Sequence, residues 1–224
     1  MKLYHFPSPN PQKVHLAILE LGLECELVPI DLTKGEQRKP EFLALNPCGR
    51  VPVLTDGDLT VSDSHAILAY LGDKTGKLWP TSAAGRAGAL QWLFFLSAHV
   101  SPPVTDLAFN RIAAKLLGLT PDEGAIARGE QALPPVIGIL EGHLAKNKWM
   151  LGDDFSLVDC AFGPVLNALE KARFSFADFP KVRTYLEAFR SRPSWQATPP
   201  PPHALASSRS GKVWLQAPRG LSAN

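Results

Sequence analysis

Two residue pairs in this chain could together hold a peptide-like ligand. Val51-Pro52 opens an extended segment, and Asp63-Ser64 opens a helical one. Proline at the start of a strand has no N–H to give to the sheet, and if its peptide bond is cis, the backbone N–H and C=O of Val51 face outward toward an extended ligand. The start of a helix offers free N–H groups and the positive end of the helix dipole to a carboxylate. The spacing therefore predicts a site for a ligand with an extended backbone and an anionic end.

The elements that must position these pairs belong to an α/β pattern in residues 1–75. Strand and helix patterns alternate there in the order βαβ, loop, ββα, which predicts a small α/β domain with a mixed sheet. Asp56-Gly57 lies between two short extended segments and is a strong hairpin signal. The expected elements are strands at 2–6, 25–30, 52–55 and 59–61 and helices at 11–21 and 63–72.

The pattern changes after an expected linker at residues 76–86. Residues 87–197 show helical periodicity, which predicts an all-α second domain. From 198 to 224 the chain is rich in proline and then in small polar residues, so we expect an extended or disordered tail.

Two features inside the helical region predict local structure. Pro134-Pro135 falls within a long periodic stretch and should kink or interrupt that helix. Ser156 and Asp159 have the spacing of a capping box, in which the acid bonds back to the N–H of the capping serine. We assign these two residues to the fold and not to chemistry.

Composition excludes several classes of function. The chain has 224 residues, a formal net charge of +2 and no Lys/Arg cluster, which argues against a nucleic-acid partner. Its apolar runs are shorter than the roughly 20 residues that cross a bilayer, and the N-terminus lacks a signal layout, so we expect a cytoplasmic protein without a membrane partner. The three cysteines are widely spaced and no Cys/His metal spacing occurs, so we expect neither a disulfide framework nor a bound metal.

Taken together, the motifs resemble those of the glutathione transferase family. The resemblance covers about residues 1–196 and is carried by N-P-C-G-R-V-P-V-L, D-S-H-A-I-L-A-Y-L, F-S-L-V-D and F-P-K-V-R-T-Y-L-E-A-F-R-S-R-P-S-W. It implies a thioredoxin-like N-terminal domain that binds glutathione and an all-α C-terminal domain that carries a hydrophobic co-substrate site. It also implies a transferase that uses glutathione as co-substrate, without metal, and that forms a homodimer.

The same resemblance implies how the opening pairs would bind glutathione. Val51 would pair its backbone with the cysteinyl part of the tripeptide, since Pro52 matches the family's cis-proline. Asp63 would bind the γ-glutamyl ammonium, while the Ser64 hydroxyl and the helix N–H groups would bind the γ-glutamyl carboxylate.

Three further residues match positions near the glycyl carboxylate. They are Gln37 and Arg38, in a G-E-Q-R-K-P-E-F loop that resembles the family's G-E-H-K-x-P-E-F, and Arg50. Gln37 replaces a histidine and Arg38 a lysine, and arginine can still bind a carboxylate with two hydrogen bonds. Polar loop residues are commonly just solvated, so this alternative stays open for all three.

The group that stabilises the glutathione thiolate is expected at the start of the first helix, where the family has Tyr, Ser or Cys. This chain reads F-P-S-P-N-P-Q-K-V, without Cys, and Tyr4 lies too early, within the strand. Ser8 matches the serine classes, and the side-chain amide of Asn10 is a second donor. Capping of the helix is the structural alternative for both residues. The segment also resembles a bacterial branch with T-P-N-G-x-K-V, which uses its hydroxyl residue and Asn around the sulfur and reduces disulfides with glutathione; Pro11 replaces its Gly.

Three functions remain open at this stage. The first is conjugation of glutathione to a hydrophobic electrophile, the second is a glutathione-dependent disulfide reductase or peroxidase, and the third is a binding protein that kept the fold without catalysis. Phe95, His99 and Pro102 would line the co-substrate pocket, although they could equally be core residues. Cys48 has both a redox and a structural interpretation.

Overall fold

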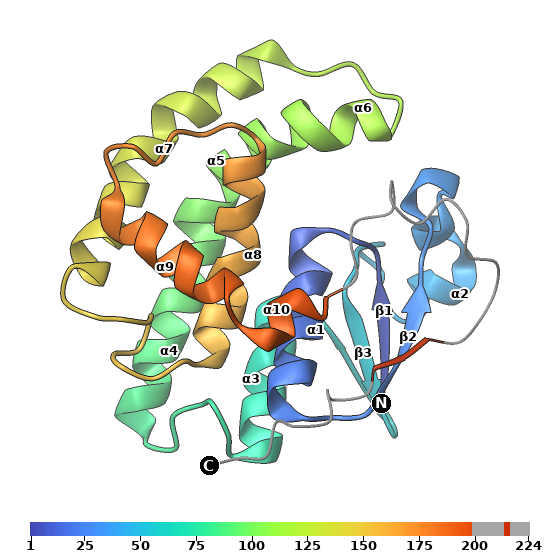
Figure 1. Ribbon diagram of the computed structural model, residues 1–224. Helices are drawn as coiled ribbons and strands as arrows, with labels where there is room; N and C mark the ends of the chain where they lie inside the picture. Colours follow the sequence, from blue (N-terminus) through green and yellow to red (C-terminus); the bar gives the residue numbers. More distant parts are fainter. Residues whose placement is uncertain (199–212, 216–224) are drawn as a thin grey trace. The chain divides into compact units, whose positions relative to one another are not determined.

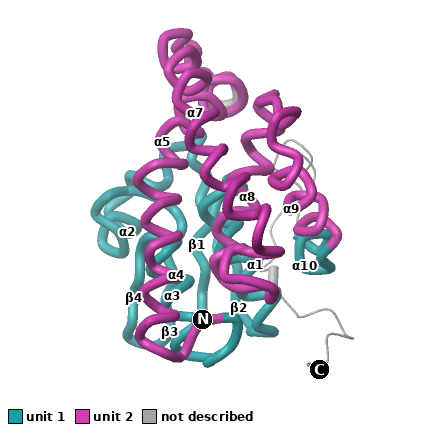
Figure 2. Tube along the Cα trace, turned by 90° about the vertical axis from the view of Figure 1, so that its left-hand side faces the viewer, with its two compact units in different colours: residues 1–78, 192–224 teal, residues 79–191 magenta. Residues whose placement is uncertain are grey.

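The computed structural model describes residues 1–198 and 213–215 (Figure 1). The chain divides into two compact units, which Figure 2 distinguishes by colour: unit 1 contains Met1–Leu78 and the chain from Arg192 onward, and unit 2 contains Trp79–Ser191. The chain therefore leaves unit 1, builds unit 2 and returns.

Unit 1 is built on a mixed sheet with the strand order β4-β3-β1-β2-β5. The strands are β1 (Lys2–His5), β2 (Cys25–Pro29), β3 (Val53–Asp56), β4 (Leu59–Ser62) and β5 (Val213–Leu215). β1 is parallel to β2 and antiparallel to β3, so Leu3 lies opposite both Leu27 and Leu54. Asp56 pairs with Leu59 across the expected hairpin. The predicted thioredoxin-like α/β fold is confirmed.

The fifth strand comes from the C-terminal segment. β5 pairs antiparallel with β2, with Leu215 opposite Cys25 and Val213 opposite Leu27. We expected residues 198–224 to be extended or disordered; three of them form this edge strand, and residues 199–212 and 216–224 lie outside the described part of the chain.

The helices of unit 1 follow from local signals. They are α1 (Pro9–Leu21), the short 3-10 turns η1 (Leu32–Lys34) and η2 (Glu36–Arg38), α2 (Pro40–Leu43), α3 (Ser64–Thr75) and α10 (Pro193–Gln196). Proline at the first position of α1 needs no N–H partner, and Gly22, with φ of 67°, ends the helix in the left-handed region. The apolar face of α1 is buried: Val14, Ala17 and Ile18 are fully inaccessible to solvent.

An ion pair ties the returning chain to unit 1. Arg192 Nε and Nη2 each lie 2.6 Å from a different carboxylate oxygen of Glu20, and Ser194 Oγ donates to the same carboxylate. Bidentate arginine–carboxylate pairs are among the strongest and most directional hydrogen-bonded contacts. This contact explains why the chain from Arg192 groups with unit 1, whereas we assigned residues up to 197 to the helical domain.

Unit 2 is helical throughout, as predicted. Its helices are α4 (Ala83–Phe95), α5 (Ser101–Val104), α6 (Ala114–Leu116), α7 (Glu123–Leu144), α8 (Leu157–Lys171) and α9 (Pro180–Arg190), with the π-helical segments η3 (Leu96–Val100) and η4 (Thr105–Ala113). The chain from α4 to α6 is thus continuously helical. Gly163 of α8 lets Phe189 of α9 approach so closely that an added Cβ would lie 2.1 Å from the ring.

The interruption that Pro134-Pro135 could cause in the long helix of unit 2 does not occur. α7 runs without interruption through Pro134 and Pro135. Each proline removes a hydrogen bond to the carbonyl four residues earlier, at Glu130 and Gln131. Because these four residues are all exposed on α7, water can bind the freed carbonyls, which removes the reason for the helix to stop there.

The capping box is confirmed. Asp159 Oδ2 accepts from the Ser156 N–H at 2.9 Å and from its hydroxyl at 2.7 Å. Asp159 Oδ1 accepts from the Met150 N–H at 2.8 Å and from the Tyr185 hydroxyl at 3.1 Å. This fully buried carboxylate therefore joins α8 to the loop before it and to α9.

Candidate active site

A pocket of about 520 Å³ opens in unit 1 where the starts of α1 and α3 face the loop before β3. This volume lies within the range typical of small-molecule sites. The lining residues are Asn10, Asn46, Cys48, Arg50, Val51, Pro52, Ser62, Asp63 and Ser64. The pairs Val51-Pro52 and Asp63-Ser64 thus line one pocket.

The loop before β3 is shaped by a residue to which we assigned no role. Asn46 is buried, its Nδ2 donates to the Arg50 carbonyl at 2.7 Å, and its Oδ1 accepts from the Cys48 N–H at 3.1 Å. These bonds close the turn that delivers Val51 to the cis peptide bond with Pro52. The available signal was an asparagine at a turn, where its side chain commonly bonds to nearby backbone.

The start of α3 combines a cap with an unusual backbone. Asp63 Oδ1 accepts from the N–H groups of His65 at 2.8 Å and Ala66 at 3.3 Å. Asp63 has φ of 80°, a region that non-glycine residues rarely occupy and that tends to mark functional sites. Ser64 beside it is buried, with 4% of its surface exposed. An exposed carboxylate and a buried hydroxyl therefore face the same pocket.

Ser8 and Asn10 lie on either side of the first residue of α1. Ser8 precedes the helix in extended conformation, and its hydroxyl makes no cap bond; its Oγ lies 3.5 Å from the Phe6 carbonyl. The structural alternative for Ser8, capping of α1, is therefore not what its side chain does. Asn10 is exposed and lines the pocket, whereas Ser8 is not among the lining residues.

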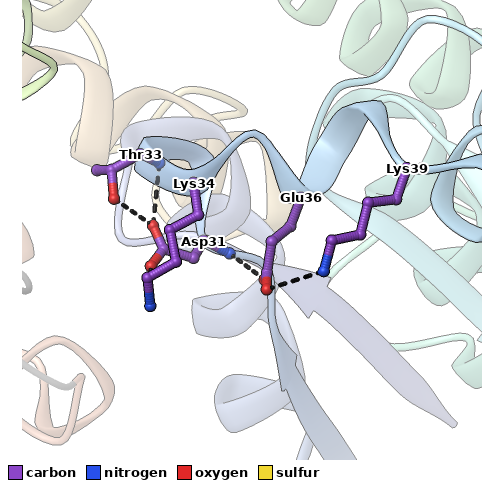
Figure 3. A network of polar contacts seen from close by, with 5 residues as sticks. All are labelled: Asp31, Thr33, Lys34, Glu36 and Lys39. Atoms are coloured by element: carbon purple, nitrogen blue, oxygen red, sulfur yellow. Dashed lines mark hydrogen bonds and ion pairs between the residues drawn. The ribbon is translucent and has the colours of Figure 1, made fainter.

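A polar network fixes the loop that carries Gln37 and Arg38 (Figure 3). The Glu36 carboxylate accepts from the Asp31 N–H at 2.8 Å and pairs with Lys39 at 3.3 Å, while the Asp31 carboxylate accepts from Thr33 and pairs with Lys34. The hydrogen bond from Thr33 is the main cause that lowers the pKa of Asp31, and the Asp31 N–H is the main cause that lowers the pKa of Glu36. Both carboxylates therefore stay ionised at neutral pH and hold the loop closed.

Gly49 brings this loop against the Val51-Pro52 loop. Its φ is 60°, and a Cβ added there would lie 3.0 Å from the Gln37 carbonyl oxygen. Gln37 and Arg38 are nevertheless not among the residues that line the pocket. Arg50 does line it, so the structure brings together only one of the three residues that we placed near the glycyl carboxylate.

The residues expected to bind the second substrate lie in unit 2. The rings of Phe95 and His99 are 5.5 Å apart, and Phe95 also contacts Trp92 edge-on at 5.5 Å. His99 and Pro102 are exposed. These three predicted residues share one continuous helical stretch, and their role stays a prediction.

Within 1–198 and 213–215, no three or more His, Cys, Asp or Glu side chains group closely enough to hold a metal ion. None of the helices in this part of the chain has both the length and the apolar character of a membrane span.

Comparison with known proteins agrees with this arrangement. The family model for the N-terminal domain of glutathione S-transferases matches residues 1–73, and the model for the C-terminal domain matches residues 88–193. Glutathione S-transferase 3 from Zea mays is 38% identical over 222 residues, covering 92% of this chain and 99% of the relative. The disulfide-bond oxidoreductase YfcG from Escherichia coli is 32% identical, with 86% and 91% covered.

A solved structure is similar over most of the chain. A glutathione transferase from Burkholderia graminis, with two glutathione molecules bound per subunit, matches with a TM-score of 0.78 and 34% identity, covering 87% of this chain and 85% of the other.

A thioredoxin-like unit with a cis-proline loop, followed by an all-helical unit, defines the two-domain class of glutathione-dependent enzymes. The chain belongs to the glutathione S-transferase family. It is a glutathione transferase with glutathione as co-substrate, which sets aside the alternative of a binding protein without catalysis.

Proposed function

We propose that this enzyme transfers the glutathione thiolate to a hydrophobic electrophile. The observation that carries the proposal is the single pocket lined by Asn10, Val51-Pro52 and Asp63-Ser64. This pocket offers a hydrogen-bond donor for the thiolate sulfur, an extended backbone segment and an acid–hydroxyl pair. A γ-glutamyl tripeptide requires these groups.

In this proposal each end of glutathione has its own partner. The Val51 backbone pairs with the cysteinyl part. Asp63 binds the γ-glutamyl ammonium, and the hydroxyl and backbone N–H of Ser64 at the start of α3 bind its carboxylate. Arg50 faces the glycyl carboxylate, and Gln37 and Arg38 approach it from the loop that Gly49 holds close.

The thiolate would be stabilised by Asn10 and Ser8 at the start of α1. Asn10 lines the pocket and its amide can donate to the sulfur. Among the described residues, the Ser8 hydroxyl has a single partner, the Phe6 carbonyl, at the long distance of 3.5 Å, and it can exchange this contact for the sulfur. Both groups act together with the positive end of the helix dipole.

Disulfide reduction with glutathione is the second candidate activity. The Ser8-Pro-Asn10 segment, which resembles the bacterial disulfide-reducing branch, and the similarity to the disulfide-bond oxidoreductase support it. In that reaction, the glutathione thiolate attacks a disulfide sulfur, and the displaced thiolate leaves with the electron pair.

Turnover of two model substrates separates the candidates. We expect 1-chloro-2,4-dinitrobenzene to be conjugated faster than hydroxyethyl disulfide is reduced, and a preference for the disulfide would replace the first proposal with the second. Removing the main sulfur donor should lower kcat/KM about 100-fold. Ser8→Ala and Asn10→Ala are therefore compared under the same conditions, and a variant with unchanged kinetics loses its assignment as donor.

We also infer that the enzyme is a homodimer with a hydrophobic co-substrate site that includes Phe95, His99 and Pro102. Exposed apolar side chains on α4 support the dimer: Leu90 and Phe94 are 38% and 68% exposed and lie one helical turn apart. A cytoplasmic location of the enzyme stays a prediction.

A further inference from the structure

Unit 1 contains a lysine that is almost completely buried. Lys13 of α1 has only 1% of its surface exposed. Lysine is almost never fully buried unless its ammonium has a partner, because an isolated charge is costly to remove from water. Lys13 lies one helical turn after Asn10, which lines the pocket, so its charge is placed next to the site.

The partner of this lysine lies on the other helix of the site. Lys13 Nζ is 3.1 Å from His65 Nε2, and His65 directly follows Ser64 at the start of α3. The Asp63 carboxylate also attracts the Lys13 ammonium. Lys13 therefore connects the helix that carries Asn10 to the helix start that carries Asp63 and Ser64.

Burial brings the titration of this lysine close to neutral pH. It lowers the pKa of Lys13 to about 7, against the opposing attraction of Asp63. Burial and then the Lys13 charge lower the pKa of His65 to about 4, so the imidazole is neutral at pH 7 and its Nε2 accepts from the ammonium. Lys13 is thus divided between its charged and neutral forms.

The other elements packed on α1 also carry titratable side chains. β1 brings Lys2, Tyr4 and His5, of which His5 acts on His15 of α1. Beyond its first turn α3 brings Tyr70 and Lys74, which both bond to Asp56, and Asp73. α10 (Pro193–Gln196) contains no titratable residue. Asp63 attracts the Lys13 ammonium and His65 contacts it directly, so these two groups of the α3 start act on Lys13.

We propose that Lys13 is a positioning residue of the glutathione site, which takes up a proton from solvent when the γ-glutamyl carboxylate binds at the start of α3. The inference rests on the proposed function of this pocket. An anion bound beside Ser64 favours the charged form of the nearby lysine, and the charged form in turn favours the anion. The ammonium also holds His65, and with it the first turn of α3, in place for the ligand.

Calorimetric titration with S-methylglutathione tests this proposal. The probe has no thiol, so the titration of sulfur does not contribute. Binding is measured at pH 7.5 in phosphate and in Tris buffer, whose ionisation enthalpies differ, so the difference in binding heat reports the protons taken up. We expect net proton uptake by the wild-type enzyme and a tighter complex at pH 6.5 than at pH 8.

Two substitutions of Lys13 give opposite expectations for affinity. Lys13→Arg keeps the charge at all these pH values, so it should bind S-methylglutathione at least as tightly as the wild type but without the uptake due to Lys13. Lys13→Met keeps the aliphatic stem and loses the charge, so it should bind about tenfold more weakly and also lack that uptake. Lys77→Met makes the same change at an exposed lysine and should behave as the wild type.

The outcomes separate this inference from the proposed function. Uptake by the ligand's own amino group is common to all variants, so equal uptake in wild type and Lys13→Arg would overturn the role of Lys13 alone. Unchanged affinity in Lys13→Met would do the same. If the wild type does not bind S-methylglutathione at millimolar concentration, the glutathione pocket itself is refuted. If Lys13→Met does not fold, the comparison of wild type with Lys13→Arg still decides.

Discussion

His15 has a buried imidazole that takes up a proton only at acidic pH. It is 5% exposed, and its Nε2 is buried without a hydrogen-bond partner in the described structure. Burial, and then the proximity of His5, lower its pKa to about 4 from the ordinary 6.5. The folded state therefore resists protonation of this ring more strongly than the unfolded chain does.

This difference sets a pH dependence of stability. Because the pKa of His15 is lower in the folded state, its contribution is fully present above pH 6.5 and is lost as the pH falls through 4. We expect His15 alone to account for up to about 3 kcal/mol of the free energy of unfolding lost between these pH values. His15→Phe fills a similar volume without titrating, so its urea-unfolding free energy should fall less between pH 7 and pH 4. Parallel curves for the two proteins would contradict the assignment.

At the residue scale, the sequence predicted part of the pocket lining. Val51, Asp63 and Ser64 were identified because a proline-opened strand and a helix start have distinct signals. Asn46, which also lines the pocket, was missed because the direction of an asparagine side chain is not written in its type. The burial of Lys13 was missed because it depends on α3, which is far away in the sequence. Gln37 and Arg38 were placed by motif, and the motif does not say which loop residues reach the pocket.

Among the elements, the loop that ends at Pro52 depends on the absence of a side chain at Gly49. Two requirements meet there, a φ of 60° and an approach that would leave a Cβ 3.0 Å from the Gln37 carbonyl oxygen. Gly57 in the β3–β4 hairpin has a similar φ of 59°, but an added Cβ would meet nothing within 4 Å. A comparison of alanine substitutions at the two glycines therefore distinguishes the effect of backbone strain, which both share, from the effect of steric crowding, which only Gly49 has.

We expect Gly49→Ala and Gly57→Ala each to destabilise the protein by about 1–2 kcal/mol through the left-handed backbone. Only Gly49→Ala should also weaken glutathione binding, because the added methyl group pushes the Gln37 loop away from the Val51 loop. Thermal unfolding measures the first effect and titration with glutathione the second. An equal loss of affinity in both variants would refute the role of the close approach.

Element prediction succeeded where local signals agree with tertiary packing. The hairpin at Asp56-Gly57, the capping box at Ser156 and the helical faces all follow from spacing. The continuous α7 did not follow, because the cost of two prolines depends on whether water reaches the freed carbonyls. β5 and α10 did not follow either, because their partners, β2 and Glu20, are distant in the sequence.

For the whole molecule, the exposed face of α4 is the strongest sign of assembly. Leu90 and Phe94 lie on one side of the helix, and clustered apolar exposure of this kind tends to mark an interface. Ile139 on α7 is comparably exposed, at 53%, and offers a matched position on another helix.

If the enzyme is the proposed homodimer, Phe94→Glu should convert it to monomers at micromolar concentration, because a charge placed in an apolar interface is costly to bury. Ile139→Glu should leave the dimer intact. Sedimentation equilibrium gives the molar mass of each variant. A dimeric Phe94→Glu protein would place the interface elsewhere, and a monomeric wild type would remove the dimer from the proposal.

The return of the chain at Arg192 has a consequence for biosynthesis. Glu20 is made early, but its partners Arg192 and Ser194 leave the ribosome only after the whole of unit 2. Domains that are continuous in sequence can fold one after another as they emerge. Here unit 1 cannot complete its contacts with α1 until the helical unit and then Arg192 and Ser194 have been translated.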